Sequence, residues 1–418
     1  MNIQINGQPC VVRQNAISRY VIYSASMLSE KEARVEIELE GVQAAPTVRP
    51  LSSGIQSTIK DGRISFTAKI PCKLSVEFSE EESLPLFLFL YEPEVKPAGE
   101  NVRYFAPGEY AMDELVVSSN ETIYLAEGAV VHAHLQVVDA ENVTICGRGI
   151  FDLEGDYSTK RRRMTHFYNS KGITVRDVTF TGSHGWCCAF WGCSNILMDS
   201  VNVMTWMMCG DGVDIVGCHD VEVGNCFFRT ADDCIAVKAT DYRGEAGLQD
   251  VYNVTFHHCV CWNAKPGNGI EIGFETRCDE IRDVTFSDID LIHCEHEGWQ
   301  SGGAITIHNG DRARIHNIIY RDIRVEDAVD KLFDFKVLHS NYSRDEKRGC
   351  VEDVLLENIS VVDGAFPPSI LSGFAPDDAL VQRVRFRNVT VHGEAIRSIL
   401  QCRMVAERTK QIEFEVTE

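Results

Sequence analysis

The fold is decided by the stretch Gly172-Ile173-Thr174-Val175-Arg176-Asp177-Val178-Thr179-Phe180, in which apolar and polar residues alternate on both sides of an aspartate. Alternation with a period of two is typical of a β-strand with one buried face. The same phrase returns at intervals of 23 to 36 residues along most of the chain. Its first apolar residue is found at Val143, Ile173, Ile196, Val221, Val254, Val284, Ile318, Val354 and Val384.

A repeat of this length, with several short strands in each copy, indicates a solenoid. One copy cannot cover its own apolar face, so successive copies stack and share a continuous core. The sequence has no long stretch with helical periodicity, which argues against α/β crossovers, and a β-propeller needs a longer repeat. We therefore predict an all-β chain whose residues 96–418 form a right-handed parallel β-helix of about ten coils.

Residues 1–95 have a different pattern, with clean alternation in three stretches separated by turns. These stretches are Arg34–Leu39, Ile64–Ile70 and Leu74–Phe78. The pattern predicts a small antiparallel β-sandwich over residues 1–95. The segment Glu92–Gly99, which contains two prolines and a glycine, is interpreted as a linker between the sandwich and the β-helix.

The composition of the 418 residues limits the partners of the protein. The net charge of −22 argues against a nucleic-acid partner, because phosphate contacts need clustered lysine and arginine. The one basic cluster, Lys160–Arg163, is interpreted as a solvent-exposed loop. The chain has no uninterrupted apolar run of roughly 18 residues, so we expect no membrane partner. The sequence leaves open whether the chain forms a homo-oligomer.

The N-terminus and the sixteen cysteines suggest a compartment. The first residues show neither a basic nor an apolar segment of a secretory signal, which predicts a cytoplasmic protein with reduced thiols, or a secreted one if a signal has been removed. Most cysteines lie in or beside apolar strand-like runs, and no pair has the Cys-x-x-Cys spacing. We therefore expect neither a metal site nor another cofactor.

Three aspartates have a spacing that fits one coil. Asp211 precedes the pair Asp232 and Asp233 by 21 residues, and residues one coil apart lie about 4.8 Å from each other. Crowded carboxylates cannot all ionise at low cost, so at least one pKa must rise. An acid and a base with separated pKa values are what glycosidic cleavage requires. Aspartates also occupy turns, where they bind backbone amides, and Asp214 is interpreted in that way.

The motifs around these aspartates resemble a known family. Gly210–Ile215 and Asp232–Val237 resemble two motifs of the polygalacturonase family of glycoside hydrolases, family 28, and Ser183–Ile196 is similar to the stretch upstream. The stretch Tyr104–Val130 looks more like the start of the dextranase and isopullulanase family, family 49, which also carries an N-terminal β-sandwich. Both families belong to one clan.

The resemblance implies an O-glycosyl hydrolase that acts with inversion. Asp232 matches the general acid, and Asp211 and Asp233 match the carboxylates that hold and deprotonate the attacking water. The spacing by itself leaves inversion and retention open. A non-catalytic glycan-binding solenoid is the alternative from another class, and a polysaccharide lyase, with Lys238 as the nearest base, is a weaker one.

Two departures from the family bear on the substrate. Gly267-Asn268-Gly269 stands where polygalacturonases have Gly-His-Gly, and Ile305-Thr306-Ile307 stands near their Arg-Ile-Lys. That motif pairs with the carboxylate of galacturonate, so the basic clamp for an acidic sugar is absent at its expected place. With the net charge, this predicts a neutral oligosaccharide such as an α-glucan. The alternative is a galacturonosidase acting on pectin fragments, with a displaced clamp from Lys265, Arg277 or Arg312.

Several residues beyond the aspartates are candidates for binding sugar. Their side chains offer hydrogen bonds or, for the tryptophan, a stacking surface. They are Asn268, Glu271, Glu275, His308 and Trp299. The loops at residues 241–250 and 294–302 are predicted to close one end of a cleft, which favours an exo-acting enzyme on an oligosaccharide or polysaccharide.

Overall fold

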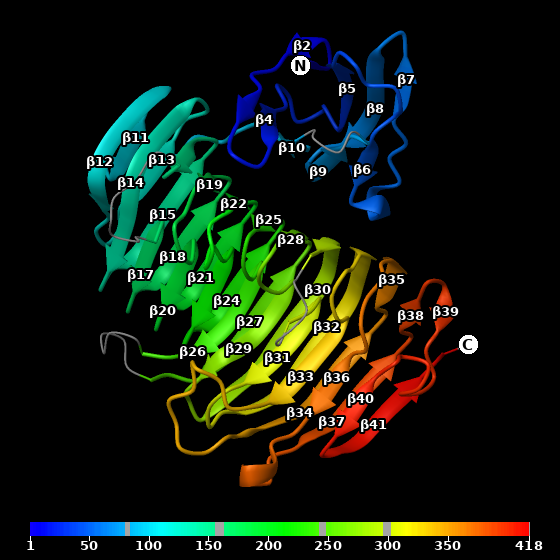
Figure 1. Ribbon diagram of the computed structural model, residues 1–418. Helices are drawn as coiled ribbons and strands as arrows, with labels where there is room; N and C mark the ends of the chain where they lie inside the picture. Colours follow the sequence, from blue (N-terminus) through cyan, green and yellow to red (C-terminus); the bar gives the residue numbers. More distant parts are fainter. Residues whose placement is uncertain (80–83, 155–162, 242–247, 296–301, 418) are drawn as a thin grey trace. The chain divides into compact units, whose positions relative to one another are not determined.

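The computed structural model describes residues 1–79, 84–154, 163–241, 248–295 and 302–417 (Figure 1). The chain forms two compact units, Met1–Ala98 and Gly99–Glu418. Almost all regular structure is β, and the two described helical turns are the 3₁₀ segments η1 (Leu51–Ser53) and η2 (Ala375–Asp377). None of the described helices is long and apolar enough to cross a membrane.

The first unit is a sandwich of two five-stranded sheets. The inward residues of β5 and β8, such as Val35 and Phe66, pack against inward residues of β9 and β10, such as Leu74 and Leu88. The predicted sandwich is confirmed, although β4 and β10 pair in parallel. One sheet has the order β2 (Gln8–Pro9), β1 (Asn2–Ile5), β5 (Glu32–Glu38), β8 (Arg63–Lys69), β7 (Thr58–Lys60), and the other has the order β3 (Arg13–Gln14), β4 (Arg19–Ser24), β10 (Leu86–Tyr91), β9 (Cys72–Glu77), β6 (Thr47–Arg49).

The second unit is the predicted parallel β-helix, in which each strand pairs with a strand of the next coil (Figure 1). Three parallel sheets run along it. The first consists of β11 (Val102–Phe105), β13 (Thr122–Leu125), β15 (Glu141–Gly147), β18 (Lys171–Arg176), β21 (Ser194–Asp199), β24 (His219–Gly224), β27 (Val251–His257), β30 (Glu280–Cys294), β32 (Arg314–Asp327), β34 (Cys350–Glu357), β37 (Val381–Arg387) and β41 (Thr409–Glu415).

The second and third sheets complete each coil. The second consists of β12 (Gly108–Val116), β14 (Ala129–Val138), β16 (Ile150–Asp152), β19 (Thr179–Thr181), β22 (Asn202–Met204), β25 (Phe227–Thr230), β28 (Val260–Asn263), the C-terminal parts of the long strands β30 and β32, β35 (Ser360–Asp363) and β38 (Thr390–Val391), with the short β39 (Glu394–Ala395) antiparallel to β38. The third consists of β17 (Thr165–Tyr168), β20 (Cys188–Trp191), β23 (Val213–Val216), β26 (Ile235–Ala239), β29 (Ile270–Thr276), β31 (Ile305–Asn309), β33 (Phe333–Val337), β36 (Ile370–Ser372) and β40 (Val405–Glu407).

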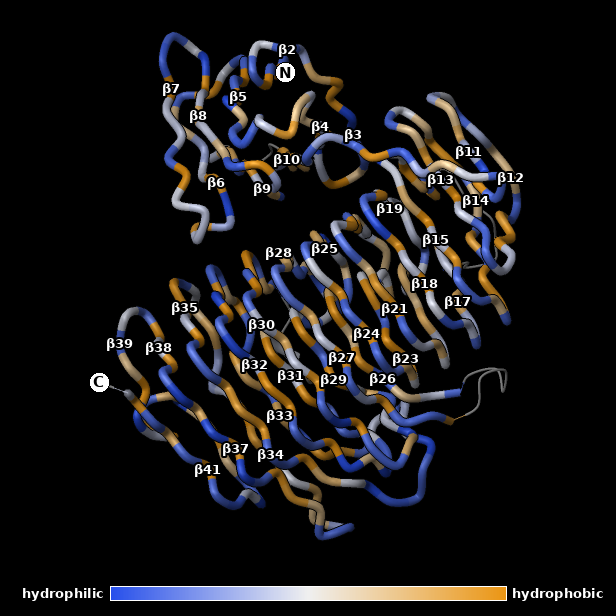
Figure 2. The backbone as a smooth tube through the Cα atoms, turned by 180° about the vertical axis from the view of Figure 1, so that it is seen from behind, coloured by the Kyte–Doolittle hydropathy of each residue, from blue (hydrophilic) through white to orange (hydrophobic). Residues whose placement is uncertain are grey.

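The register of the first sheet agrees with the sequence repeat. The nine apolar positions that begin the repeated phrase pair in succession, each with the corresponding position of the next copy, in eight pairings from Val143 with Ile173 to Val354 with Val384. All nine side chains are buried in one continuous core. Figure 2 shows hydrophobic and hydrophilic segments alternating along these strands. The stack extends beyond the phrase at both ends, so it has more coils than the ten predicted.

The aspartates and asparagines inside the repeat have a conformational reason. Asn195, Asp220, Asn253 and Asp283 have φ angles of 53° to 56°, in the left-handed region that asparagine and aspartate tolerate better than other non-glycine residues. Their side chains also form ladders between coils, as in the bond of 2.7 Å from Asn225 to Asp199. The four residues lie inside strands of the first sheet, and the regular pairing with the neighbouring strands is interrupted at each of them.

The third sheet positions the polar residues that matter for function. Its inner face is apolar, with side chains such as Ile215, Val237 and Ile272 in the core. Because side chains alternate along a strand, the neighbouring residues point to the other face. That face carries a row of ionisable side chains from successive coils: Asp214, Lys238, Glu271, His308, Asp334 and Lys336.

Candidate active site

The three predicted aspartates lie together at one corner of the β-helix. Asp211 immediately precedes β23, and Asp232 and Asp233 precede β26, which is its neighbour in the third sheet. One carboxylate oxygen from each of the three lies within 4.8 Å of the others. The backbone N–H of Gly212 donates to the carbonyl oxygen of Asp233 at 2.8 Å, which fixes the two turns against each other. Asp211 thus lies beside Asp232 and Asp233, as predicted from their separation in the sequence by about one coil.

Asp232 differs from the other two aspartates in its exposure. Its side chain is half-buried, whereas Asp211 and Asp233 are 1% and 6% exposed. The Asp232 carboxylate accepts the backbone N–H groups of Cys209 at 3.0 Å and of Asp233 at 3.1 Å. Burial raises the pKa of the Asp232 carboxyl above its ordinary value. A reachable carboxyl with a raised pKa is what a general acid requires.

Lys238 lies at the centre of the buried carboxylates. Its Nζ is 2.8 Å from Oδ2 of Asp211, 2.9 Å from Oδ1 of Asp214 and 3.5 Å from Oδ2 of Asp233. Burial alone would lower the pKa of Lys238, but these three carboxylates outweigh it and hold the pKa well above its ordinary value. The sequence indicated Lys238 only as a base for a lyase, and Asp214 only as a turn residue. The structure places both in this ion-pair cluster.

The cluster holds more negative groups than one ammonium can balance. Burial raises the pKa of Asp211 well above its ordinary value, and the neighbouring Asp214 raises it further. Burial likewise raises the pKa of Asp233. Because the groups interact strongly, the proton belongs to the cluster rather than to one residue. The cluster therefore holds its protons more tightly than isolated aspartates would.

The donor set also bears on metal binding. The oxygens of Asp211, Asp232 and Asp233 are close enough together to hold a metal ion. The ammonium of Lys238, however, lies 2.8 Å from Asp211 and supplies a positive charge at the same place. A second cation would meet this charge, so we interpret the cluster as a proton-handling site.

Asn268 contacts Asp233 directly. Its backbone N–H and its side-chain amide donate to Oδ1 of Asp233 at 3.0 and 2.7 Å, and its own Oδ1 accepts the N–H of Gly303 at 3.0 Å. The side chain is 4% exposed. Asn268 therefore orients Asp233, which differs from its predicted role in binding sugar. The preceding Gly267 has φ +113°, and a Cβ there would lie 2.3 Å from the backbone of Asp232.

Glu271 and His308 form a buried layer beside the aspartates. Nδ1 of His308 lies 2.9 Å from the Glu271 carboxylate, and its Nε2 lies 3.3 Å from Asp334. Burial alone would lower the pKa of His308, but the two carboxylates raise it to about 9. Neither Glu271 nor His308 exposes any surface on which a sugar could lie, contrary to the prediction. Glu271 and His308 lie on the outward face of the third sheet but are buried. The alternation of apolar and polar residues along a strand does not predict this burial.

The remaining predicted residues have varied positions. Glu275 is 6% exposed, and its charge contributes to the raised pKa of Lys238. Trp299 lies outside the described residues, as do most of the two loops predicted to close the cleft. Two of the three candidate clamp residues are already paired, since Arg277 and Arg312 both contact Asp345 at 3.0 Å. Lys265 is exposed and has no ion pair among the described residues.

Tyr342 was not identified from the sequence. It lies between β33 and β34, is 51% exposed, and its ring centroid is 5.7 Å from that of Phe274, which stacks on His308. Burial raises the pKa of Tyr342, and the charges of Glu275 and Asp232 raise it further, so the ring lies near the carboxylates. The segment between β33 and β34 lies outside the sequence repeat, so no periodic pattern in the sequence pointed to Tyr342.

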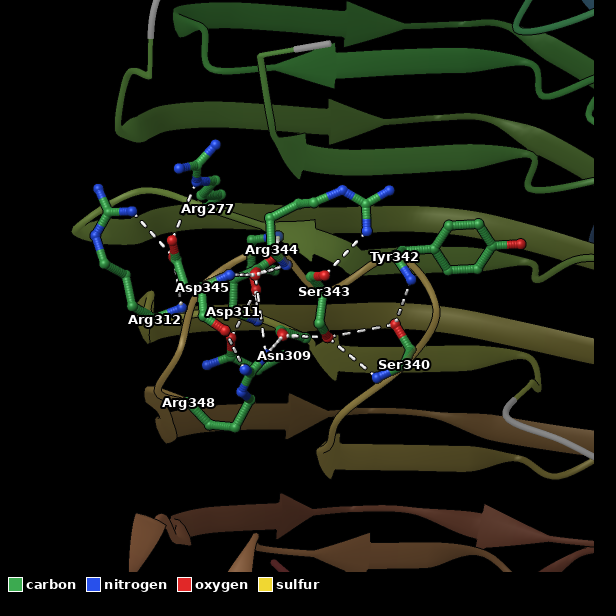
Figure 3. A network of polar contacts seen from close by, with 12 residues as sticks. Arg277, Asn309, Asp311, Arg312, Ser340, Tyr342, Ser343, Arg344, Asp345 and Arg348 are labelled. Carbon is green, nitrogen blue, oxygen red and sulfur yellow. Dashed lines mark hydrogen bonds and ion pairs between the residues drawn. The ribbon is translucent and has the colours of Figure 1, made fainter. Parts of the chain in front are cut away.

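A polar network fixes the segment that carries Tyr342 (Figure 3). The buried carboxylate of Asp311 accepts the backbone N–H groups of Arg344 at 2.6 Å and of Asp345 at 2.7 Å. Ser343 and Arg348 both donate to the carbonyl oxygen of Gly310. The segment is therefore held against the coil beneath it by specific bonds.

Trp186 is a second aromatic residue at the aspartates. Its half-buried ring lies over Nζ of Lys238, at 4.0 Å from the ring centroid, and stacks on Trp191 with centroids 5.3 Å apart. The structure places it directly above the ammonium of the cluster.

Comparisons with known proteins agree with this architecture. The structure resembles Dex49A from Penicillium minioluteum, with a TM-score of 0.67 at 15% identity over 96% of this chain and 83% of the other. It also resembles the family 28 exopolygalacturonase of Yersinia enterocolitica, with a TM-score of 0.59 at 11% identity over 98% and 96% of the two chains. At these identities the likeness shows the fold, which is that of parallel β-helix proteins.

The sequence comparisons give the family. The chain is 23% identical over 269 residues, 56% of its length, to a relative from Aspergillus niger named "Putative galacturan 1,4-alpha-galacturonidase C". It spans about half the length of that relative and less of another polygalacturonase that it matches. Residues 118–406 match the family described as glycosyl hydrolases family 28. Since that match covers most of the β-helix and all three aspartates, the chain belongs to glycosyl hydrolases family 28.

Proposed function

We propose that the protein is a glycoside hydrolase that cleaves an α-galacturonide bond in an oligosaccharide. The observation that carries the proposal is the half-buried Asp232, with its raised pKa, beside two buried carboxyls that share Lys238. Membership of family 28 and the printed name of the Aspergillus relative support a galacturonide. This reverses the order of the two substrates predicted from the sequence.

The geometry supports a specific division of roles. The carboxyl of Asp232 gives its proton to the glycosidic oxygen as the bond from that oxygen to the anomeric carbon breaks. Asp211 and Asp233 hold a water molecule, take one of its protons, and direct its oxygen to the anomeric carbon. Oδ1 of Asp211 has no hydrogen-bond partner among the described residues and can accept from that water. Lys238 stabilises the negative charge that remains on these carboxylates.

Inversion is the stereochemical part of the proposal, and it follows from the family resemblance. The oxygens of the three aspartates lie within 4.8 Å of one another, closer than the ~6.5–9.5 Å between carboxyls in most inverting pairs. The anomer must therefore be measured. Proton NMR during the first minutes of hydrolysis should show the β-anomer released from an α-linkage, and an initial α-anomer would contradict inversion.

We also propose that the enzyme acts from a chain end. The support is the fixed segment between β33 and β34, which holds the exposed Tyr342 against Phe274, the residue that stacks on His308. Because this segment is held in place on one side of the site, it limits how far a bound sugar chain can extend. Exo-action predicts that a long oligomer yields only the terminal product from the first turnovers, whereas a mixture of intermediate lengths would indicate endo-action.

A second candidate substrate is a neutral α-glucan, favoured by one observation. At the place expected for a basic clamp, the Thr306 hydroxyl bonds to the carbonyl oxygen of Ile270 at 2.9 Å, and His308 is held between Glu271 and Asp334. Neither group is available to a sugar carboxylate.

One assay separates the candidates. Reducing ends should be measured after incubation with trigalacturonate and with isomaltotriose, using Asp232→Asn as the inactive control. Release from trigalacturonate alone supports the galacturonide. Release from isomaltotriose alone supports the glucan, and no release from either, with the variant identical to wild type, would favour a non-catalytic glycan-binding solenoid.

A further inference from the structure

Arg163 lies in an unusual position for the end of a basic cluster. Its guanidinium carbon is 4.7 Å from the ring centroid of Trp186 and 4.8 Å from that of Trp191. The residue is half-buried, which differs from the solvent-exposed loop predicted for the cluster, whose other members lie outside the described residues. Two stacked indoles therefore hold this cation in one place.

Arg163 makes no ion pair with any residue that the structure describes, which distinguishes it from Lys238, Arg277 and Arg312. Lys238 is surrounded by three carboxylates, and Arg277 and Arg312 share Asp345. An arginine that stacks on aromatic rings keeps its N–H groups available, and its planar fork matches a carboxylate. Its charge is therefore available for a ligand.

The position of Arg163 relative to the aspartates follows from short contacts. The Trp186 ring that contacts Arg163 also lies over Nζ of Lys238, which is 2.8 Å from Asp211. In the third sheet, Trp191 pairs with Val216, and Val216 pairs with Lys238, so these residues lie on successive coils. Arg163 is thus on the N-terminal side of the aspartates, next to the place where the bond is cleaved.

We infer that Arg163, supported by Trp186, binds the carboxylate of an acidic sugar ring adjacent to the cleaved bond. This site takes over the task of the clamp that is absent at Ile305-Thr306-Ile307, on the opposite side of the aspartates along the stack of coils. The inference rests on the proposed function, because it names the group by which that site selects its substrate. It makes Arg163 a specificity-determining residue.

Charge alone does not explain this choice of residue. Lys265 is also a cation without an ion pair among the described residues, and it lies two residues from the Gly267 turn that packs on Asp232. Lys265 is exposed, however, and contacts no aromatic ring in the described part of the chain, whereas Arg163 is held by two. A held cation loses less side-chain entropy on binding a ligand. Lys265 therefore provides a matched control that also removes one positive charge.

The test measures binding without turnover. In the Asp232→Asn background, isothermal titration gives Kd for trigalacturonate and for its methyl ester, which has the same shape without the charge. We expect the acid to bind at least about tenfold more tightly than the ester, since a charge-assisted hydrogen bond contributes about 1.5–3 kcal/mol. Adding Arg163→Gln should reduce this ratio to about one, and adding Lys265→Gln should leave it unchanged.

Each outcome decides the inference. The inference about Arg163 is overturned if the preference for the acid over the ester is unchanged in Arg163→Gln. It is also overturned if that preference is lost in Lys265→Gln instead. Either result leaves the proposed function standing. Failure of the Asp232→Asn protein to bind either ligand contradicts the proposed galacturonide itself. Should Arg163→Gln not fold, as judged by its melting temperature, Arg163→Lys decides: it keeps the charge but not the fork, so the ratio should fall several-fold, and an unchanged ratio overturns the inference.

Discussion

Nζ of Lys238 lies 2.8 Å from Oδ2 of Asp211, and both side chains are almost completely buried. An ammonium in this position is surrounded by carboxylates that water does not screen. The ion pair therefore links stability and function: it makes a crowded set of acids tolerable in the core, and it keeps them close enough to share a proton.

Removing the ammonium should be costly. In Lys238→Met, the carboxylates of Asp211, Asp214 and Asp233 lose their shared counter-charge while they remain buried. Breaking a buried ion pair typically costs about 3–5 kcal/mol. We expect a clear fall in the midpoint of urea unfolding. Lys31→Met, which removes an exposed pair with Glu92, should change the midpoint little, and equal effects of the two variants would contradict this account.

Asp232→Asn should abolish turnover and leave the fold intact. A general acid contributes about 10²–10⁴-fold to the rate, and the amide cannot supply the proton. The fall in kcat should appear with little change in melting temperature, because Asp232 is half-buried and the amide oxygen can still accept one of the two backbone N–H groups that bind the carboxylate. Glu109→Gln, at an exposed carboxylate on β12, is the control and should retain full activity.

The buried acids predict how stability changes with pH. Burial raises the pKa of Asp211 in the folded state above its unfolded value, so the folded state holds this proton more tightly. Its contribution to stability is complete below the unfolded pKa, about 3.9, and is lost as the pH rises toward the folded value. Asp211→Asn removes this loss. Measured by chemical unfolding, the variant should gain stability relative to wild type between pH 4 and pH 8, and a constant difference would count against the raised pKa.

Asn268 should set the pH dependence of the reaction. Burial raises the pKa of Asp233, and the hydrogen bond from Asn268 partly lowers it. Asn268→Ala removes the side-chain donor, so the pKa of Asp233 should rise further. The acidic limb of the kcat/KM profile should then move to higher pH, while Asn268→Ser, which keeps a donor, should move it less. A profile displaced in rate but not in pH would assign Asn268 a role in packing only.

Asp311 should control the segment that carries Tyr342. The carboxylate accepts the backbone N–H groups of Arg344 and Asp345, and it is 1% exposed. Asp311→Ala leaves these donors without an acceptor, at a cost of about 1–3 kcal/mol for each group left unsatisfied. We expect faster hydrogen exchange in residues 338–349 and a raised KM. Tyr342→Phe, which keeps the ring, should leave KM close to wild type if the ring face is what contacts the sugar.

Much of the fold could be predicted because it depends on patterns among residues that are close together in the sequence. In every copy of the phrase around Ile173, the apolar residues predict which side chains face inward, and Asp or Asn predicts the turn that follows. The pairing of Val143 with Ile173, and of each later copy with the next, adds nothing that the repeat had not specified. The closeness of Asp211 to Asp232 and Asp233 was predicted for the same reason, because an offset of about one coil places residues side by side.

The environment of each site residue was not predictable in this way. Glu271 and His308 occupy outward positions on their strands, which suggested contact with sugar, yet both side chains are completely buried. The pairing of Lys238 with Asp214 depends on the lengths of two different coils. Arg163 and Tyr342 belong to segments outside the repeat. No periodic pattern there predicts the direction in which a side chain points.

The sequence by itself determined the stacked β-helix, the sandwich before it, and the corner at which three aspartates meet. It could do so because strand alternation and coil length act between neighbouring residues. The tertiary structure alone decided which carboxyl remains reachable, which cation balances the others, and which arginine stacks on two indole rings. These properties depend on burial and on pairing between distant segments, and both exist only after the coils have closed on one another.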